Sequence, residues 1–262
     1  MTRPVFLAED LSCVPSSLAV GERATLGGSE GRHAASVRRI GAGEWVDVAD
    51  GRGLRLTCEV VGADKSSLSL VVREVVQEES PRPEIILVQA LAKGGRDEAA
   101  VEICTEIGID RVIPWASQRA IVQWRGPKAE KGRAKWEGVV RAAAKQSRRA
   151  YVPVVEAVTD SRELASWVRA LTDEAGAAFV CHEEATQSLG AALARVQGDA
   201  TDGFLPARVA LIVGPEGGIG PEETAQLVAA GARTVGLGAN VLRSSTAGAV
   251  ALTLIRAAVG AY

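Results

Sequence analysis

The sequence predicts an α/β fold with a parallel sheet, preceded by a small β domain. After about residue 84, short apolar runs alternate with segments whose apolar residues recur at helical spacing. Such alternation is typical of parallel strands joined by right-handed helical crossovers. Before residue 75 apolar and polar residues instead alternate at period two, and the stretch between is polar and broken by prolines. We therefore expect domains at 1–75 and 84–262, joined by a linker at 76–83.

The first domain is predicted to be a half-buried antiparallel sheet. Its alternating apolar residues fall in three groups: Val46 and Val48; Leu54, Leu56, Cys58 and Val60; Leu68, Leu70 and Val72. Asp50-Gly51 and Gly62-Ala63-Asp64 separate the groups as turn signals. A sheet of this size has a small core.

The second domain is predicted to hold six strands, each followed by a helix. The expected strands are 85–88, 112–115, 152–155, 177–181, 209–213 and 233–237. The expected helices are 100–107, 131–147, 161–175, 187–196, one that begins at Pro221, and 246–258. Gly108 and Gly176 are predicted to end the first and third helices.

Composition excludes several classes of protein. Apolar residues make up 47 % and charged residues 24 % of the 262 residues, and no apolar run reaches the ~20 residues of a membrane span. The N-terminus shows no basic segment followed by an apolar core, so we expect a cytoplasmic protein. Four scattered cysteines and two histidines predict neither a disulfide framework nor a metal site.

The net charge of −2 conceals a basic band. Residues 111–149 hold eleven Lys or Arg and two acidic residues, which leaves 19 basic and 30 acidic residues elsewhere. A charge run is usually a solvated helix face, but three tryptophans lie in this one, at 115, 124 and 136. Aromatic rings among cations suit base stacking beside phosphate contacts, so the band favours RNA binding.

Two glycine-rich turns are the candidate ligand site. They occupy 211–223 (LIVGPEGGIGPEE) and 237–248 (LGANVLRSSTAG), and each connects a predicted strand to a helix. Glycines allow a ligand to approach backbone N–H groups closely, and Ser244 or Ser245 could cap the second helix. Ordinary βα loops are the alternative for either turn alone; the pair favours one crevice at a sheet edge. Neither turn matches a P-loop or GxGxxG, which disfavours an ATPase or a nucleotide-dependent oxidoreductase.

Found together in this order, the GPEGG turn and the LG…LR…TA turn resemble the RsmE-type ribosomal RNA methyltransferases of the SPOUT superfamily. Two other segments match: 93–98 (KGGRDE), and 135–148 with its Gln-Ser-x-Arg ending. The resemblance spans nearly the whole chain. It implies a PUA-like RNA-binding N-terminal domain, a SPOUT-type parallel sheet with a C-terminal trefoil knot, and a homodimer. It also implies S-adenosylmethionine as cofactor and N3 of a uridine in small-subunit ribosomal RNA, free or in the assembled subunit, as acceptor.

Site residues follow from the matched motifs. The expected cofactor-binding residues are Gly214, Glu216, Gly217, Gly218, Leu237, Gly238, Asn240, Leu242 and Arg243. The N3 proton must leave before that nitrogen can attack, so catalysis needs a base or a cation that stabilises the uridine anion. We expect Arg243 as the cation and Glu216 as a weaker choice of base; the alternatives are phosphate binding by Arg243 and helix capping by Glu216.

The expected RNA-binding residues are Arg3, His33, Arg38, Arg39, Lys93, Arg96, Arg125, Lys145 and Arg148. A surface histidine, helix-end capping by Lys93 and Arg96, and contacts of Arg148 with the next strand are the alternatives. Two positions depart from the family: Ser245 stands where many members have an acid, and Ile219 where an aromatic residue is commoner. A non-catalytic RNA-binding or ribosome-associated protein and a ribose 2′-O-methyltransferase therefore stay as alternative functions.

Overall fold

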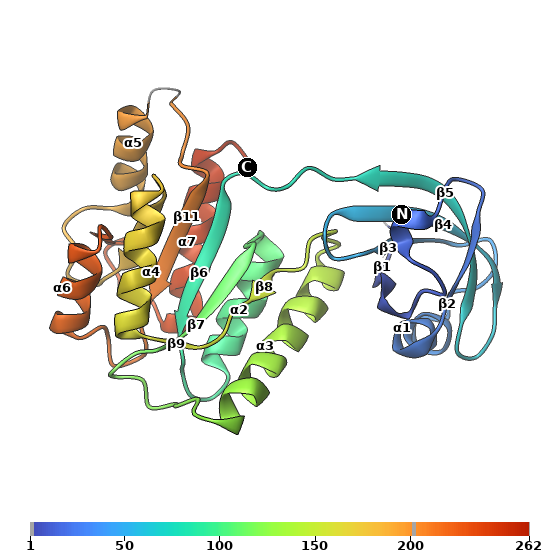
Figure 1. Cartoon of the computed structure of the whole chain (residues 1–262), viewed down its shortest axis with the longest axis horizontal. Helices are drawn as coiled ribbons and strands as arrows, with labels where there is room; N and C mark the ends of the chain where they lie inside the picture. Colours follow the sequence, from blue (N-terminus) through green and yellow to red (C-terminus); the bar gives the residue numbers. More distant parts are fainter. Residues whose placement is uncertain (1–2, 201–202, 262) are drawn as a thin grey trace. The chain divides into compact units, whose positions relative to one another are not determined.

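The computed structural model describes residues 3–200 and 203–261 in two compact units (Figure 1). The N-terminal unit comprises Met1–Ser80 and Arg141–Val152, and the C-terminal unit comprises Pro81–Val140 and Pro153–Tyr262. The boundary at Ser80 falls inside the expected linker. Residues 141–152 lie apart in sequence from the rest of their unit.

The N-terminal unit contains a five-stranded sheet in the order β1-β3-β4-β5-β2 among the residues the structure describes. The strands are β1 Val5–Leu7, β2 Arg23–Leu26, β3 Trp45–Ala49, β4 Leu54–Ala63 and β5 Leu68–Gln77. Strands β3, β4, β5 and β2 pair antiparallel, as predicted, but β1 pairs parallel to β3, so a purely antiparallel sheet was wrong. Short helical segments complete the unit: 3₁₀ turns Ala8–Asp10 and Pro15–Ser17, α1 Gly28–Arg32, and a π-helical turn His33–Val37.

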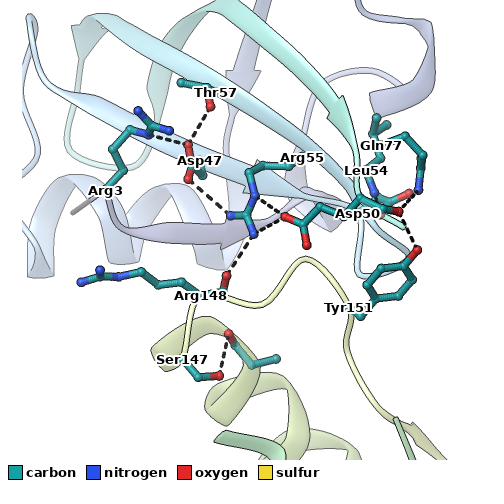
Figure 2. Close-up of polar contacts among 12 residues, drawn as sticks. Arg3, Asp47, Asp50, Leu54, Arg55, Thr57, Gln77, Ser147, Arg148 and Tyr151 are labelled. Atoms are coloured by element: carbon teal, nitrogen blue, oxygen red, sulfur yellow. Dashed lines mark hydrogen bonds and ion pairs between the residues drawn. The ribbon is translucent and has the colours of Figure 1, made fainter. Parts of the chain in front are cut away.

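Arg55 joins the strands of this unit to residues 141–152 (Figure 2). Its guanidinium donates to Asp47 Oδ2 at 3.3 Å, to Glu78 Oε1 at 2.7 Å and to the backbone oxygen of Arg148 at 3.0 Å. Asp47, itself buried, also accepts from Arg3 Nε at 2.9 Å. Asp47 and Arg55 thus connect Arg3, the strands of the sheet and residues 141–152. The carboxylate of Asp47 needs these partners, because an unpaired buried charge is strongly destabilising.

The C-terminal unit contains a parallel sheet in the order β12-β10-β11-β6-β7-β8, with β9 also paired to β7. The strands are β6 Glu84–Ala90, β7 Arg111–Ala116, β8 Val154–Val155, β9 Thr159–Asp160, β10 Ala177–Cys181, β11 Arg208–Val213 and β12 Arg233–Val235. Every recorded pairing in it is parallel, which confirms the predicted fold class. From β6 the chain adds β7 and β8 on one side of the sheet, and it then adds β10, β11 and β12 on the other side, with β11 between β10 and β6.

Helices cover both faces of this sheet (Figure 1). They are α2 Arg96–Ile107, α3 Pro127–Gln146, α4 Ser161–Asp173, α5 Leu189–Asp199, α6 Pro221–Ala229 and α7 Ser244–Ala258. Helices α4 and α6 pack together over one face, and α2, α5 and α7 over the other. Gly248 of α7 permits this close packing, because a Cβ there would lie 3.2 Å from both Cys104 Sγ and Leu87 Cδ1.

Three local predictions were wrong. Helix α4 ends at Asp173, and Ala175 rather than Gly176 has the positive φ, +59°, after it, so Gly176 does not end the helix. Helix α7 begins at Ser244 itself and its N-cap is Arg243, which makes no side-chain cap, so neither serine caps the helix. The strand expected at 152–155 is only Val154–Val155, because the N–H of Val152 donates to Gly51 of the N-terminal unit's own sheet region. Helix α2 ends at Gly108, with φ +120°, as predicted.

The trefoil knot stays a prediction. After edge strand β12 the chain returns across the sheet, and α7 packs against α2, β6 and β11. No helix among the described residues is both long enough and apolar enough to cross a membrane.

Glu223 in the first turn of α6 holds the loops at the carboxyl edge of the sheet. Its side chain is fully buried and accepts from the backbone N–H of Gln118 at 2.8 Å and of Gly220 at 3.2 Å. It also accepts a short hydrogen bond from the Ser161 hydroxyl, which in turn accepts from Trp115 Nε1. One carboxylate therefore connects the loop after β7, the start of α4 and the start of α6.

We expect Glu223→Ala to lower the free energy of unfolding by about 3 kcal/mol, because three donors lose a charged acceptor. Urea unfolding followed by circular dichroism measures this change. Glu222→Ala is the control, since Glu222 is exposed in the same helical turn and should change stability by less than about 0.5 kcal/mol. Equal losses in the two variants would contradict the role assigned to Glu223.

Candidate cofactor pocket and RNA-facing residues

A pocket of about 650 Å³ lies at the carboxyl edge of the sheet, within the C-terminal unit. Most of its lining residues lie within three segments, 181–184 at the end of β10, 213–221 at the end of β11 and 236–244 after β12, and Arg119 and Ala247 add to it. Helix α6 adds Thr224, Ala225 and Val228. The volume lies within the range of about 300–1,000 Å³ that is usual for small-molecule sites.

Six of the nine expected cofactor-binding residues line this pocket: Gly214, Gly218, Leu237, Gly238, Asn240 and Leu242. Gly218 has φ +71° and Gly238 has φ +133°, so both use backbone conformations that favour glycine. A Cβ on Gly214 would lie 2.5 Å from Ile219 Cγ1, which leaves no room for a side chain. The turns therefore present backbone to the cavity.

Glu216 does not line the pocket. Its side chain forms an ion pair instead. Arg96 Nη1 donates to its Oε1 at 2.8 Å and so joins the 93–98 turn to the GPEGG turn. Partial burial raises the pKa of the Glu216 carboxyl, but hydrogen bonds from its own N–H and from Arg96, together with the Arg96 charge, hold the pKa below its usual value. A lowered pKa makes Glu216 a weaker base, which favours its alternative role as a structural anion.

The 93–98 turn is fixed by a buried acid. Gly94 and Gly95 have φ of +69° and +74°, and Asp97 accepts from the N–H of Ala92 at 3.1 Å. Burial raises the pKa of Asp97, although hydrogen bonds from the N–H of Ala92 and of Glu98 oppose the shift. The exposed side chain of Lys93 is thereby held at the start of α2.

Gly217 and Arg243 do not line the pocket, although their sequence neighbours Gly218, Leu242 and Ser244 do. The backbone oxygen of Gly217 accepts from Arg119 Nη1 at 3.1 Å. The side chain of Arg243 is exposed, whereas its backbone oxygen accepts from the N–H of Thr246 and of Ala247 in the first turn of α7. Among the described residues its guanidinium has no recorded partner, so it is free to meet an anion.

Sequence reasoning missed part of the pocket wall. Arg119, His182, Glu183, Glu184 and Thr224 all line it. The HEE triplet follows strand β10 directly, and the position after a parallel strand was the signal that could have identified it. Burial raises the pKa of nearby Cys181 to about 12, so that side chain is a neutral thiol near pH 7.

The expected RNA-binding residues of the N-terminal unit differ in their availability. His33, Arg38, Arg39 and Arg148 are exposed. Arg3 pairs with Asp47, and Lys145 Nζ lies 2.5 Å from Glu30 Oε1. For the four exposed residues no ion pair is recorded in the described part of the chain.

In the C-terminal unit, Lys93 and Arg125 are exposed and Arg96 is paired with Glu216. Stacking of RNA bases on Trp115 and Trp136 was a wrong expectation, because both side chains are fully buried. Trp124 is half-buried and packs edge-to-face on Trp136, with ring centroids 5.1 Å apart. These rings stabilise the core instead. Across residues 3–200 and 203–261, no group of three or more His, Cys, Asp or Glu side chains could hold a metal ion.

Comparison with known proteins agrees with this architecture. The family model of the RNA methyltransferase domain matches residues 78–256, and that of the RNA methyltransferase PUA domain matches residues 26–73. A protein of Mycobacterium tuberculosis named ribosomal RNA small subunit methyltransferase E is 42 % identical over 232 residues, covering 88 % of this chain and 85 % of the relative. The protein of the same name in Bacillus subtilis is 28 % identical and covers 87 % of each chain.

Solved structures share the fold. The ribosomal RNA small subunit methyltransferase E of Neisseria gonorrhoeae, bound to S-adenosylmethionine, superposes with a TM-score of 0.80 at 25 % identity over 98 % of each chain. A Legionella pneumophila methyltransferase with the same cofactor gives a TM-score of 0.78 at 23 % identity, also over 98 % of each chain. The chain belongs to the family of the ribosomal RNA small subunit methyltransferases E.

Proposed function

We propose that this protein transfers a methyl group from S-adenosylmethionine to N3 of a uridine in small-subunit ribosomal RNA. The observation that carries the proposal is the pocket formed by the two glycine-rich turns, in a chain whose fold matches an enzyme bound to that cofactor. Membership of the family supports methyl transfer as the reaction and small-subunit ribosomal RNA as the substrate. The position on the base comes from the resemblance alone and needs its own test.

The pocket residues fit the cofactor. Backbone groups of Gly214, Gly218 and Gly238 would contact its polar parts, and Leu237 and Leu242 would form an apolar wall for adenine. The cofactor supplies an activated methyl group, so the protein has to position the reactants and exclude competing acceptors. The side-chain amide of Asn240 would add a contact with the cofactor. Glu216 and Gly217 would stabilise the turn through their contacts with Arg96 and Arg119.

Arg243 is the proposed catalytic cation. Loss of the N3 proton leaves negative charge on the uracil ring, and a nearby guanidinium stabilises that charge. Arg243 is exposed, stands in the chain between Leu242 and Ser244, which line the pocket, and lacks a recorded partner among the described residues. Glu216 is retained as a candidate base of second rank, because its lowered pKa and its ion pair with Arg96 disfavour proton uptake.

For RNA binding, we propose the exposed residues His33, Arg38, Arg39 and Arg148 in one unit and Lys93 and Arg125 in the other. Arg3, Arg96 and Lys145 would take part only after leaving their present carboxylate partners. The substrate is then free or assembled small-subunit RNA, and the protein acts in the cytoplasm.

Mass spectrometry of nucleosides from methylated small-subunit RNA tests the acceptor. We expect 3-methyluridine, formed only when both enzyme and cofactor are present. An alkali-resistant linkage would instead indicate methylation of a ribose 2′-oxygen. Absence of transfer to free RNA and to the assembled subunit would favour the non-catalytic RNA-binding protein.

Arg243→Ala should separate catalysis from cofactor binding. We expect kcat to fall about 100-fold, as when a preorganised charge-stabilising donor is lost, while affinity for S-adenosylmethionine changes less than about threefold. Arg233→Ala is the control, because Arg233 is also exposed but lies on β12 outside the pocket wall. Methyl transfer from labelled cofactor gives kcat, and unchanged turnover in Arg243→Ala would contradict the proposed role.

Gly218→Trp should abolish cofactor binding. Its φ of +71° is strained for any side chain, and an indole would fill space in the pocket, so we expect affinity to fall at least about 100-fold in calorimetry. Gly260→Trp is the matched control, because Gly260 has φ +75° and open space around it. If Gly218→Trp binds like Gly260→Trp, the cofactor does not occupy this pocket.

We also propose a homodimer formed through the C-terminal unit. Val250 and Leu254 are 36 % and 38 % exposed one turn apart on α7, and the exposed Val228 and Val241 line the pocket. Neighbouring exposed apolar side chains, such as the pair on α7, are typical of an interface. In sedimentation velocity, Leu254→Glu should shift a dimer toward monomer, whereas Val154→Glu, at an exposed site on β8, should not.

A further inference from the structure

The first residue of helix α7 carries a hydroxyl whose proton has no recorded acceptor within the described part of the chain. Ser244 is only 7 % exposed, yet it lines the cofactor pocket. Its Oγ lies 2.9 Å from Nε2 of Gln89, at the carboxyl end of β6. Ser244 is the first helical residue and not the N-cap, so its hydroxyl is available for this contact.

The direction of that hydrogen bond is settled by a second contact. Gln89 Nε2 also lies 3.2 Å from the backbone oxygen of Ala90, which can only accept. The amide NH₂ therefore donates to both oxygens, and a flipped amide would bring two acceptors together. Ser244 Oγ must accept from Gln89, so its own proton is left to donate. No acceptor for that proton is recorded among the described residues.

Retaining an amide at position 89 costs stability. Gln89 is fully buried, and its Oε1 has no hydrogen-bond partner within the described part of the chain. A buried polar atom without a partner costs about 1–3 kcal/mol, and an apolar side chain would fill the same position without that cost. What the amide adds is a fixed orientation of the Ser244 hydroxyl.

We propose that Ser244, oriented by Gln89, donates a hydrogen bond to an acceptor atom of S-adenosylmethionine. The inference rests on the proposed function of the pocket. The carboxylate of the cofactor and the oxygen and nitrogen atoms of its adenosine can accept, whereas the sulfonium and ammonium groups cannot. Ser244 is thus a cofactor-binding residue, and Gln89 is a positioning residue that acts through it.

Two substitutions of nearly equal shape test the hydroxyl. Ser244→Thr keeps it and Ser244→Val removes it, so any shared steric effect cancels. In calorimetric titration with S-adenosylmethionine, we expect the threonine variant to bind about tenfold more tightly than the valine variant, the effect of one hydrogen bond. Ser245→Val is the control outside the pocket wall and should bind like the wild type. Thermal unfolding checks that each variant is folded.

Gln89→Met tests the positioning role. It should lower the affinity for S-adenosylmethionine in the wild-type background. In the Ser244→Val background it should lower the affinity by less than a further factor of about two, because Gln89 acts only through the Ser244 hydroxyl. Titration with 5′-methylthioadenosine locates the acceptor: a loss in Ser244→Val for both ligands assigns it to adenosine, and a loss for S-adenosylmethionine alone assigns it to the amino-acid part.

If Ser244→Thr and Ser244→Val both bind S-adenosylmethionine as tightly as the wild type does, the inference is overturned and the proposed function still stands. If both bind weakly, Gln89→Met decides, and unchanged binding in it overturns the inference. A wild-type protein that does not bind S-adenosylmethionine, alone or with RNA, would overturn both.

Discussion

The parallel pairing of β11 between β10 and β6 is the constraint on which the site depends. In register, Cys181 lies beside Val213, and Val213 lies beside Gln89, so three strands end at the same level. The loops that follow emerge at one edge of the sheet, although they are far apart in sequence. A pocket at this edge is a consequence of strand order, as in other open parallel sheets.

Glycine turns at that edge have few side chains with which to stabilise themselves. Support comes from polar side chains, one of them the buried Glu223, on neighbouring segments. Glu223 holds the end of the first turn, Arg119 holds the backbone at Gly217, and the Arg96–Glu216 pair anchors its middle. The protein thereby keeps the backbone of the turns available to a ligand while their conformation is fixed from outside. Such support is the usual requirement for a precise binding site.

The predictability of each part follows from its physical origin. The parallel sheet, the C-terminal end of α2 and the glycine turns were predicted because they depend on local signals: apolar periodicity, glycine after a helix and Pro221 at a helix start. The function was recognised through the order of two motifs. The burial of Trp115 and Trp136 was not predicted, since burial depends on which helix covers them. Nor could local sequence show that the Ser244 hydroxyl contacts Gln89, 155 residues away, rather than its own helix.

The same distinction applies to the basic band. Read as a list of charges, residues 111–149 suggest a continuous phosphate-binding surface. In the structure, Arg111 pairs with Glu84 and Glu156, and Lys135 pairs with Glu98, so these cations stabilise the fold. A paired cation must give up its carboxylate before it can bind phosphate, which lowers its net contribution. Arg125, Lys128 and Lys131 are exposed and have no acidic partner recorded in the described chain. The cations of this band that have no recorded partner in the described chain therefore lie at Arg125, in the first two turns of α3 and at Arg148 after the helix, not along the whole helix.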